Sequence, residues 1–201
     1  MKFKEGLILN VTIYIYDEAE VLDFSGPYEV FSVANRFLSE DKKHNLFFVS
    51  EKEIVTARGD YKVLSNYNLN NHPKIDILIV VGGVHTAELE KQNVIQWIEK
   101  ISKETKITAS VCTGAFLLAK ANILDNLKVT THWEDIDDLQ NSFPKLNVVK
   151  DVRWVDEGDI ISSAGISAGI DMSLHLISRL YDLELANKTA KQMQFDWTKN
   201  N

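Results

Sequence analysis

Two kinds of apolar pattern alternate along the chain. In the first kind, short runs are rich in β-branched and aromatic residues, which favour strands. These runs are Ile8–Tyr16, Leu46–Val49, Ile75–Val81, Ile107–Val111 and, as a shorter candidate, Val129–Thr131. The run from Ile75 to Val81 is nearly continuous in branched aliphatic residues, as expected for a central parallel strand that is buried on both faces. The more polar stretch between residues 50 and 71 predicts further short strands.

In the second kind, apolar residues recur every three or four positions, which favours helices. The segments with this spacing are Tyr28–Ser39, Thr86–Glu104, Ala115–Ala121, Glu134–Gln140, Ser167–Tyr181 and Leu183–Met193. Pro27 fits the first turn of the first helix, where its missing N–H has no intrahelical partner to lose. Residues Val152–Ser163 predict a hairpin around Gly158. The alternation predicts one α/β domain over residues 1–201, with a mostly parallel sheet covered on both faces.

Composition agrees with a globular domain that can bury a full core. The chain has 201 residues, of which 45% are hydrophobic and 25% charged, with 9 Gly and 3 Pro, so disorder and low-complexity architectures are excluded as global descriptions. The net charge is −7 and the basic residues are scattered, which predicts neither a nucleic-acid nor a membrane partner. No run approaches the ~18–20 apolar residues of a membrane-spanning helix. We therefore expect a cytoplasmic protein.

The single cysteine, Cys112, stands where an apolar strand changes into an apolar helix. Ser110 and Gly114 place small residues two positions before and after it, which is the spacing of a nucleophile elbow. At a helix N-terminus the orphan N–H groups and the helix dipole favour a thiolate, so the pattern predicts a lowered thiol pKa. The alternative is that Cys112 is a small buried hydrophobic residue, because free cysteine is among the residue types that are most often buried.

Five stretches, in this order, are similar to motifs of a known family. They are Val21-Leu22-Asp23-Phe24-Ser25-Gly26-Pro27, Val81-Gly82-Gly83, Ser110-Val111-Cys112-Thr113-Gly114, Thr130-Thr131-His132-Trp133 and Gly165-Ile166-Ser167-Ala168-Gly169-Ile170-Asp171. Together they span about residues 8 to 185. The chain resembles the ThiJ/PfpI family of the class I glutamine amidotransferase-like superfamily, and within it the isonitrile hydratase group.

The resemblance implies a flavodoxin-like three-layer α/β sandwich, a homodimer, and catalysis without metal or organic cofactor. It implies that Cys112 is the nucleophile, Asp23 the carboxyl group beside it and Thr113 a further active-site residue. The backbone N–H groups of Gly83 and Thr113 match the pair that stabilises developing negative charge. A carboxyl group held against a thiol can pass a proton to or from it.

Each of these residues also has a structural interpretation. In the structural interpretation, Asp23 is a capping residue ahead of Pro27. Gly83 is then part of a simple turn, because a glycine pair after a strand is common in turns. His132 is a candidate contact of the thiol, although a lone histidine is more often structural. Trp133 is a candidate pocket residue, or it packs in the core. Other acidic residues are predicted to be solvated in a loop (Asp17, Glu18, Glu20) or to complement a helix dipole (Asp171).

The leading functional hypothesis is hydration of a small, uncharged isonitrile to an N-substituted formamide through a thioimidate on Cys112, with water oriented by the Thr113 hydroxyl. The acidic chain, without a basic anchoring cluster, suits such a substrate. One alternative is a cysteine-based redox or small-molecule sensor. Another is glyoxalase or deglycase chemistry of the same superfamily. Peptidase chemistry is disfavoured because Thr113, not histidine, follows the nucleophile, and a flavin carrier because no Ser/Thr-rich phosphate loop follows the first strand.

Overall fold

A computed structural model describes residues 8–200, so residues 1–7 and 201 of the predicted domain lie outside the described part of the chain. Within that part, a seven-stranded sheet has the order β10-β11-β7-β6-β1-β2-β5. Every neighbouring pair is parallel except the hairpin β10–β11. The strands are β1 (Asn10–Tyr14), β2 (Asn45–Ser50), β5 (Tyr67–Asn68), β6 (Ile77–Val80), β7 (Ile107–Val111), β10 (Trp154–Asp156) and β11 (Ile160–Ser163).

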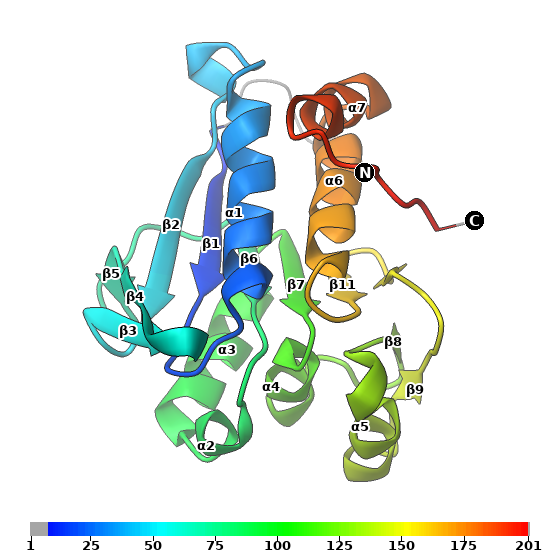
Figure 1. The fold of residues 1–201 in the computed structure, drawn as a ribbon. Helices are drawn as coiled ribbons and strands as arrows, with labels where there is room; N and C mark the ends of the chain where they lie inside the picture. Colours follow the sequence, from blue (N-terminus) through cyan, green and yellow to red (C-terminus); the bar gives the residue numbers. More distant parts are fainter. Residues whose placement is uncertain (1–7, 201) are drawn as a thin grey trace.

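Helices cover both faces of this sheet (Figure 1). Helices α1 (Val21–Asn35), α6 (Ala168–Leu180) and α7 (Leu183–Gln192) pack together on one face. Helices α2 (Thr86–Leu89), α3 (Gln92–Glu104) and α4 (Gly114–Lys120) pack together on the other. The predicted three-layer, flavodoxin-like α/β fold with a mostly parallel sheet is confirmed. In the part of the chain that the structure describes, no helix is long and apolar enough to cross a membrane.

Smaller elements lie outside the central sheet. Strands β3 (Ile54–Ala57) and β4 (Tyr61–Leu64) form an antiparallel hairpin, and β8 (Lys128–Val129) pairs with β9 (Asn147–Val148). Helix α5 (Ile136–Ser142) follows the 3₁₀ turn η3 (Trp133–Asp135), and two further 3₁₀ turns are η1 (Glu40–Lys42) and η2 (Arg58–Asp60). The candidate strand Val129–Thr131 is therefore shorter than predicted and does not join the main sheet.

The central strands are buried because they are apolar on both faces. Every residue of β6 and of β7 is buried, and Ile13 and Tyr14 of β1 are at most 2% exposed. Strands of this kind must be covered by helices on both sides. The carboxyl ends of β1, β6 and β7 consequently meet at one edge of a rigid sheet, where ligands bind in open α/β folds.

The largest differences from the prediction concern two helices. Helix α1 begins at Val21 rather than Tyr28, so Pro27 lies inside the helix instead of in its first turn. Buried Phe24 packs edge-on against Phe48, and this contact lies upstream of the proline. Tertiary packing thus outweighs the usual tendency of proline to begin a helix. The predicted helix Thr86–Glu104 is divided into α2 and α3.

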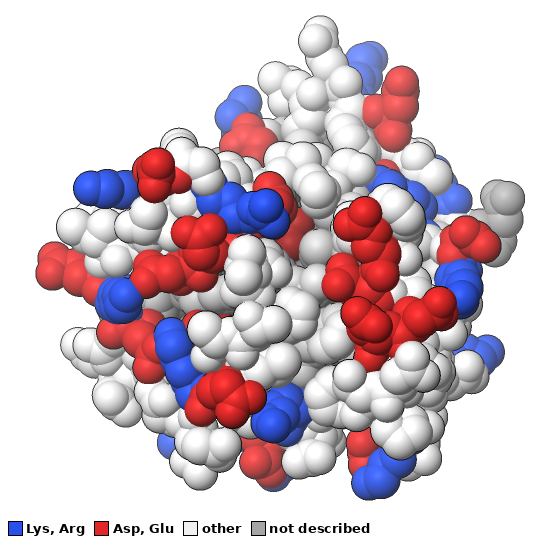
Figure 2. All heavy atoms as spheres, turned by 60° about the horizontal axis from the view of Figure 1, so that its bottom comes forward, with Lys and Arg blue, Asp and Glu red and all other residues white. Residues whose placement is uncertain are grey.

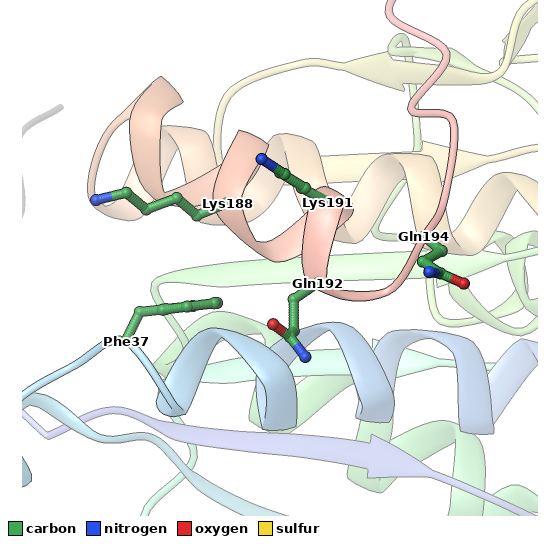
Figure 3. A pocket seen from close by; sticks show the side chains of 5 residues that line it. All are labelled: Phe37, Lys188, Lys191, Gln192 and Gln194. Carbon is green, nitrogen blue, oxygen red and sulfur yellow. The ribbon is translucent and has the colours of Figure 1, made fainter.

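A cavity of about 440 Å³ lies at the end of the molecule opposite the carboxyl edge of the sheet. It is formed between the end of α1 and α7, and Figure 3 shows the side chains that line it. They are Phe37, Lys188, Lys191, Gln192 and Gln194. None of these side chains belongs to the motifs that surround Cys112.

Candidate active site

Cys112 occupies a strained turn between β7 and α4. Its φ is +55°, in the left-handed region that residues other than glycine rarely adopt. The Cys112 N–H is shared between the carbonyls of Ser163 and Ala164, both at 3.3 Å, and the Thr131 hydroxyl donates to the Cys112 carbonyl at 2.8 Å. Strained conformations of this kind persist where the surroundings hold them, often at active sites. The predicted elbow from strand to helix is confirmed.

The elbow is too tight for larger neighbours. A Cβ atom added to Gly114 would lie 2.2 Å from the backbone oxygen of Val80, and one added to Gly82 would lie 2.5 Å from the Thr113 nitrogen. Both distances are far below a van der Waals contact. Glycine is therefore required at both positions because the loops after β6 and β7 touch through their backbones.

Asp23, in the first turn of α1, reaches across to these loops. The side chain is fully buried, and Oδ2 accepts the Gly82 N–H at 3.1 Å. Helix α1 has no side-chain cap, so the capping interpretation of Asp23 is wrong. Burial raises the Asp23 pKa from 3.8 to about 7, and the Gly82 N–H opposes the rise. The thiol of Cys112 and the Ile166 N–H also oppose it, which places both beside the carboxyl group.

The thiol itself is protonated at rest. Cys112 is 6% exposed, and burial raises the pKa of its thiol well above 9, with the Asp23 charge raising it further. The N–H groups of Thr113 and Ile166 oppose this rise. The expected lowering of the thiol pKa is therefore wrong, because desolvation exceeds the effect of the short helix α4. Forming the nucleophile requires a base, and Asp23 is adjacent.

A profile of the DJ-1/PfpI family matches residues 9–179. The chain belongs to this family. The HTH-type transcriptional regulator CdhR of Pseudomonas aeruginosa is 31% identical over 172 residues, covering 86% of this chain and 51% of the regulator. The isonitrile hydratase of Pseudomonas putida is 27% identical over 192 residues, covering 94% of this chain and 79% of the hydratase. The chain thus spans about half the length of CdhR.

A solved structure supports the same fold. The crystal structure of a ThiJ/PfpI family protein from Pseudomonas syringae superimposes with a TM-score of 0.84 at 21% identity. The match covers 98% of this chain and 79% of that one. At this level of identity the likeness establishes the DJ-1/PfpI fold.

Of the two backbone donors expected from the family resemblance, the Thr113 N–H faces the thiol and the Gly83 N–H does not. The Gly83 N–H donates to the Thr113 hydroxyl at 3.0 Å, and that hydroxyl donates back to the Gly83 carbonyl at 3.0 Å. The Thr113 N–H lowers the thiol pKa and so faces the sulfur, together with the N–H of Ile166. The resting site of this DJ-1/PfpI domain therefore presents Thr113 and Ile166 to the thiol, while Gly83 is engaged with a side chain.

Ile166 was not singled out from the sequence. Its φ is +51°, which is unusual for a β-branched residue. This conformation lies in the loop between β11 and α6 and turns the N–H toward Asp23 and Cys112. The only sequence signal was its place in the motif Gly165-Ile166-Ser167 ahead of a helix.

His132 and Trp133 lie on the loop after Thr131. The His132 Nδ1 is 3.3 Å from Asp135 Oδ2, and its ring fills the space where a side chain at Gly165 would lie. The Trp133 ring is 5.7 Å from the His132 ring and is 75% exposed, so its interpretation as a core residue is wrong. The His132 ring therefore borders the loop that carries Ile166.

The other acidic residues have their own partners. Asp17 Oδ1 accepts the Thr56 N–H at 3.0 Å, and the other oxygen pairs with Lys52. Asp171 is fully buried and pairs with Arg153, so an ion pair, beyond the helix dipole, accounts for its position. Neither carboxylate joins the pair formed by Asp23 and Cys112.

The surface around the carboxyl edge of the sheet carries both acidic and basic side chains. Figure 2 shows Asp and Glu side chains on either side of an uncharged area of this end of the molecule. Glu134, whose side chain is 63% exposed, and the partly exposed Asp135 follow His132 in the chain.

Proposed function

We propose that this protein is an isonitrile hydratase-like enzyme, which converts a small neutral isonitrile into an N-substituted formamide. The observation that carries the proposal is the pairing of the Cys112 thiol with the buried carboxyl group of Asp23. Addition to an isonitrile puts the nucleophile and a proton on the same carbon. A nucleophile with a proton carrier beside it fits this reaction.

In the first step, the Asp23 carboxylate takes the thiol proton as sulfur attacks the terminal carbon of R–N≡C. The S–C bond forms while one pair of the carbon–nitrogen bond electrons moves to the nitrogen, and the carbon keeps its lone pair, which can then accept a proton. Asp23 then gives its proton to that carbon, which leaves the thioimidate R–N=CH–S–Cys112 and a carboxylate. An Asp23 pKa of about 7 allows the group to accept and donate a proton near neutral pH.

In the second step, Asp23 takes a proton from a water molecule as its oxygen attacks the thioimidate carbon. The same proton passes to the substrate nitrogen, giving R–NH–CH(OH)–S–Cys112. Loss of the hydroxyl proton to sulfur then breaks the C–S bond and releases R–NH–CHO. The thiol and the carboxylate are restored, and the sum is addition of one water to the isonitrile.

The proposal is tested with a panel of alkyl and aryl isonitriles, with formamide measured by mass spectrometry. We expect the wild-type protein to form the formamide and Cys112→Ala to lose at least about 10³-fold of the rate, because the covalent route is removed. Absence of formamide from the wild-type protein over the whole panel would refute the hydratase proposal. Cys112→Ala that retains the wild-type rate would refute the role of the thiol.

A second candidate is a ligand-sensing domain, favoured by the 31% identity to CdhR. The site around Cys112 would then bind a small neutral compound without turning it over. Saturable binding of an isonitrile or formamide in calorimetry, with no formamide produced, supports the sensor. A purely redox sensor is less favoured because the thiol is buried and its raised pKa leaves little thiolate to oxidise. For the glyoxalase alternative, lactate formed from methylglyoxal is the corresponding measurement.

A further inference from the structure

Arg153 ties down both ends of the loop that carries Ile166. This loop, residues 164–167, joins β11 to α6. At its start, the Ala164 N–H donates to the Arg153 carbonyl at 2.9 Å. At its end, Nη2 of Arg153 donates to the Ser167 hydroxyl at 3.1 Å. One residue, which itself directly precedes β10, therefore holds the loop through its backbone and through its side chain.

The Arg153 side chain is fixed in turn by a buried carboxylate. Asp171, in the first turn of α6, is fully buried, and its Oδ2 accepts hydrogen bonds from Nε, at 2.7 Å, and from Nη2 of Arg153. The other oxygen, Oδ1, accepts the Thr198 N–H at 2.8 Å. A guanidinium group that donates two charge-assisted hydrogen bonds to a buried carboxylate has little freedom to turn. The Nη2 atom is thus kept in position to bind Ser167.

The loop lies directly against the nucleophile. The Cys112 N–H is shared between the carbonyls of Ser163 and Ala164, both at 3.3 Å, so the loop begins in contact with the elbow. Two residues further on, Ile166 has a φ of +51°, which is unfavourable for a β-branched residue. A strained conformation of this kind persists only where its surroundings hold it. Ser167, which Arg153 holds, follows the strained residue directly.

We propose that Arg153 is a positioning residue, which holds the loop 164–167 so that the Ile166 N–H points at the reacting groups of the site. These groups are Cys112 and Asp23, so the inference rests on the proposed function for their roles. The N–H stabilises the carboxylate and the thiolate, and so lowers the pKa of both groups. Releasing the loop removes this donor, and both groups then become harder to deprotonate.

Ser167→Ala is the variant that tests the proposal. It removes the side-chain bond from Arg153 to the loop and leaves the pair with Asp171 in place. Arg153→Gln is less selective, because removing one partner of a buried ion pair strongly destabilises the whole fold. Ser167→Thr keeps a hydroxyl and should restore the wild-type behaviour. Trp197→Phe is the matched control, since it removes a 3.1 Å hydrogen bond to the Asp171 carbonyl, which is not one of the bonds that hold the loop.

The measurement is the rate at which iodoacetamide alkylates Cys112 from pH 5 to 9, followed by intact mass, together with a melting curve for each variant. Cys112 is the only cysteine of the chain, so each adduct reports this site. The wild-type rate should rise as the pH passes about 7, where Asp23 becomes a carboxylate. We expect Ser167→Ala to move the midpoint of this rise upward by at least about half a pH unit, a part of the effect of one hydrogen bond to a charged group. Trp197→Phe should lower the melting temperature and keep the wild-type midpoint.

Other titratable groups act on the reacting pair, but none of the variants replaces them. They are Tyr16, Glu20 and Asp135. A shift of the midpoint between these variants therefore reports the loop and not a change in the charges around the site.

Three results would overturn the proposal. The first is Ser167→Ala that keeps the wild-type midpoint, whatever its melting temperature, because the hydroxyl would then have only a structural role. The second is Trp197→Phe that moves the midpoint as far as Ser167→Ala does, and the third is Ser167→Thr that fails to restore it. Labelling uses no isonitrile. A protein that hydrates no isonitrile but shows the expected shift therefore refutes the proposed function and leaves the role of Arg153 in place.

Discussion

Asp23→Asn is expected to slow the reactions of the Cys112 thiol by about 10²- to 10⁴-fold, the usual effect of losing a positioned acid or base. The wild-type rate should rise as the pH passes about 7, because Asp23 becomes a carboxylate that can accept the thiol proton. Asn cannot accept this proton, so the rise near pH 7 should disappear. Formamide production and iodoacetamide labelling, each measured from pH 5 to 9, check the prediction.

The same substitution should change how stability depends on pH. The folded pKa of Asp23, about 7, is higher than its ordinary pKa of 3.8, which applies to the unfolded chain. Its contribution to stability is therefore fully present below pH ~4 and is lost as the pH rises to about 7. Three pKa units correspond to about 4 kcal/mol of unfolding free energy. The wild-type protein should lose roughly this much more stability than Asp23→Asn between pH 4 and 8, measured by urea unfolding.

Comparing the wild-type protein with Asp23→Asn cancels the effect of another titrating group, His44. Burial lowers the pKa of His44 to about 4, and this acts over the same pH range with the opposite sign. His44 is present in both proteins, so its effect cancels in the difference. Asp17→Asn is the matched control, since this carboxylate lies in the loop just before α1 but pairs with Lys52 and Thr56. If Asp17→Asn removes the rise near pH 7 and Asp23→Asn keeps it, the assignment of Asp23 is wrong.

Gly114→Ala is expected to destabilise the fold by about 3 kcal/mol or more. The added methyl group would lie 2.2 Å from the oxygen and 2.9 Å from the carbonyl carbon of Val80. Val80 ends a fully buried central strand, so its backbone cannot shift without moving β1 and β7 as well. Overpacking commonly costs 1–3 kcal/mol, and a clash with fixed backbone exceeds that range. The melting temperature should fall by roughly 6–12 °C.

Gly158→Ala is the control for this prediction, because it removes glycine's conformational freedom without causing a steric clash. Gly158 has a φ of +91° and open space around its Cβ position. Alanine there is strained without a clash, which corresponds to roughly 1–2 kcal/mol. Equal melting temperatures for Gly114→Ala and Gly158→Ala would contradict the conclusion that a clash with the Val80 backbone requires glycine at position 114.

The periodicity of the sequence was enough to predict the layers and most element positions. Strand β7 matches the predicted run Ile107–Val111, because an apolar stretch bounded by polar residues has few alternatives. The start of α1 was missed because it depends on the contact of Phe24 with Phe48, between residues that are distant in the sequence. Local patterns carry no information about such contacts.

The candidate site was only partly predictable for the same reason. The motif around Cys112 predicted the elbow, but the direction of the thiol pKa depends on how deeply the sulfur is buried and on Asp23. The engagement of Gly83 with Thr113 arises from the packing of loops after different strands. Trp133 was misplaced because a large aromatic residue is usually buried, whereas here it is 75% exposed.

The exposure of Trp133 also gives the protein an optical label close to its candidate site. Of the 4 tryptophans in the chain, Trp97 and Trp154 are buried and Trp197 is partly buried. Red-shifted emission that a dissolved quencher such as acrylamide can reach should therefore come mainly from Trp133. The residue lies two positions after Thr131, whose hydroxyl holds the Cys112 carbonyl. Occupation of the thiol by a ligand can thus be followed through the accessible part of the natural fluorescence, without attaching a dye.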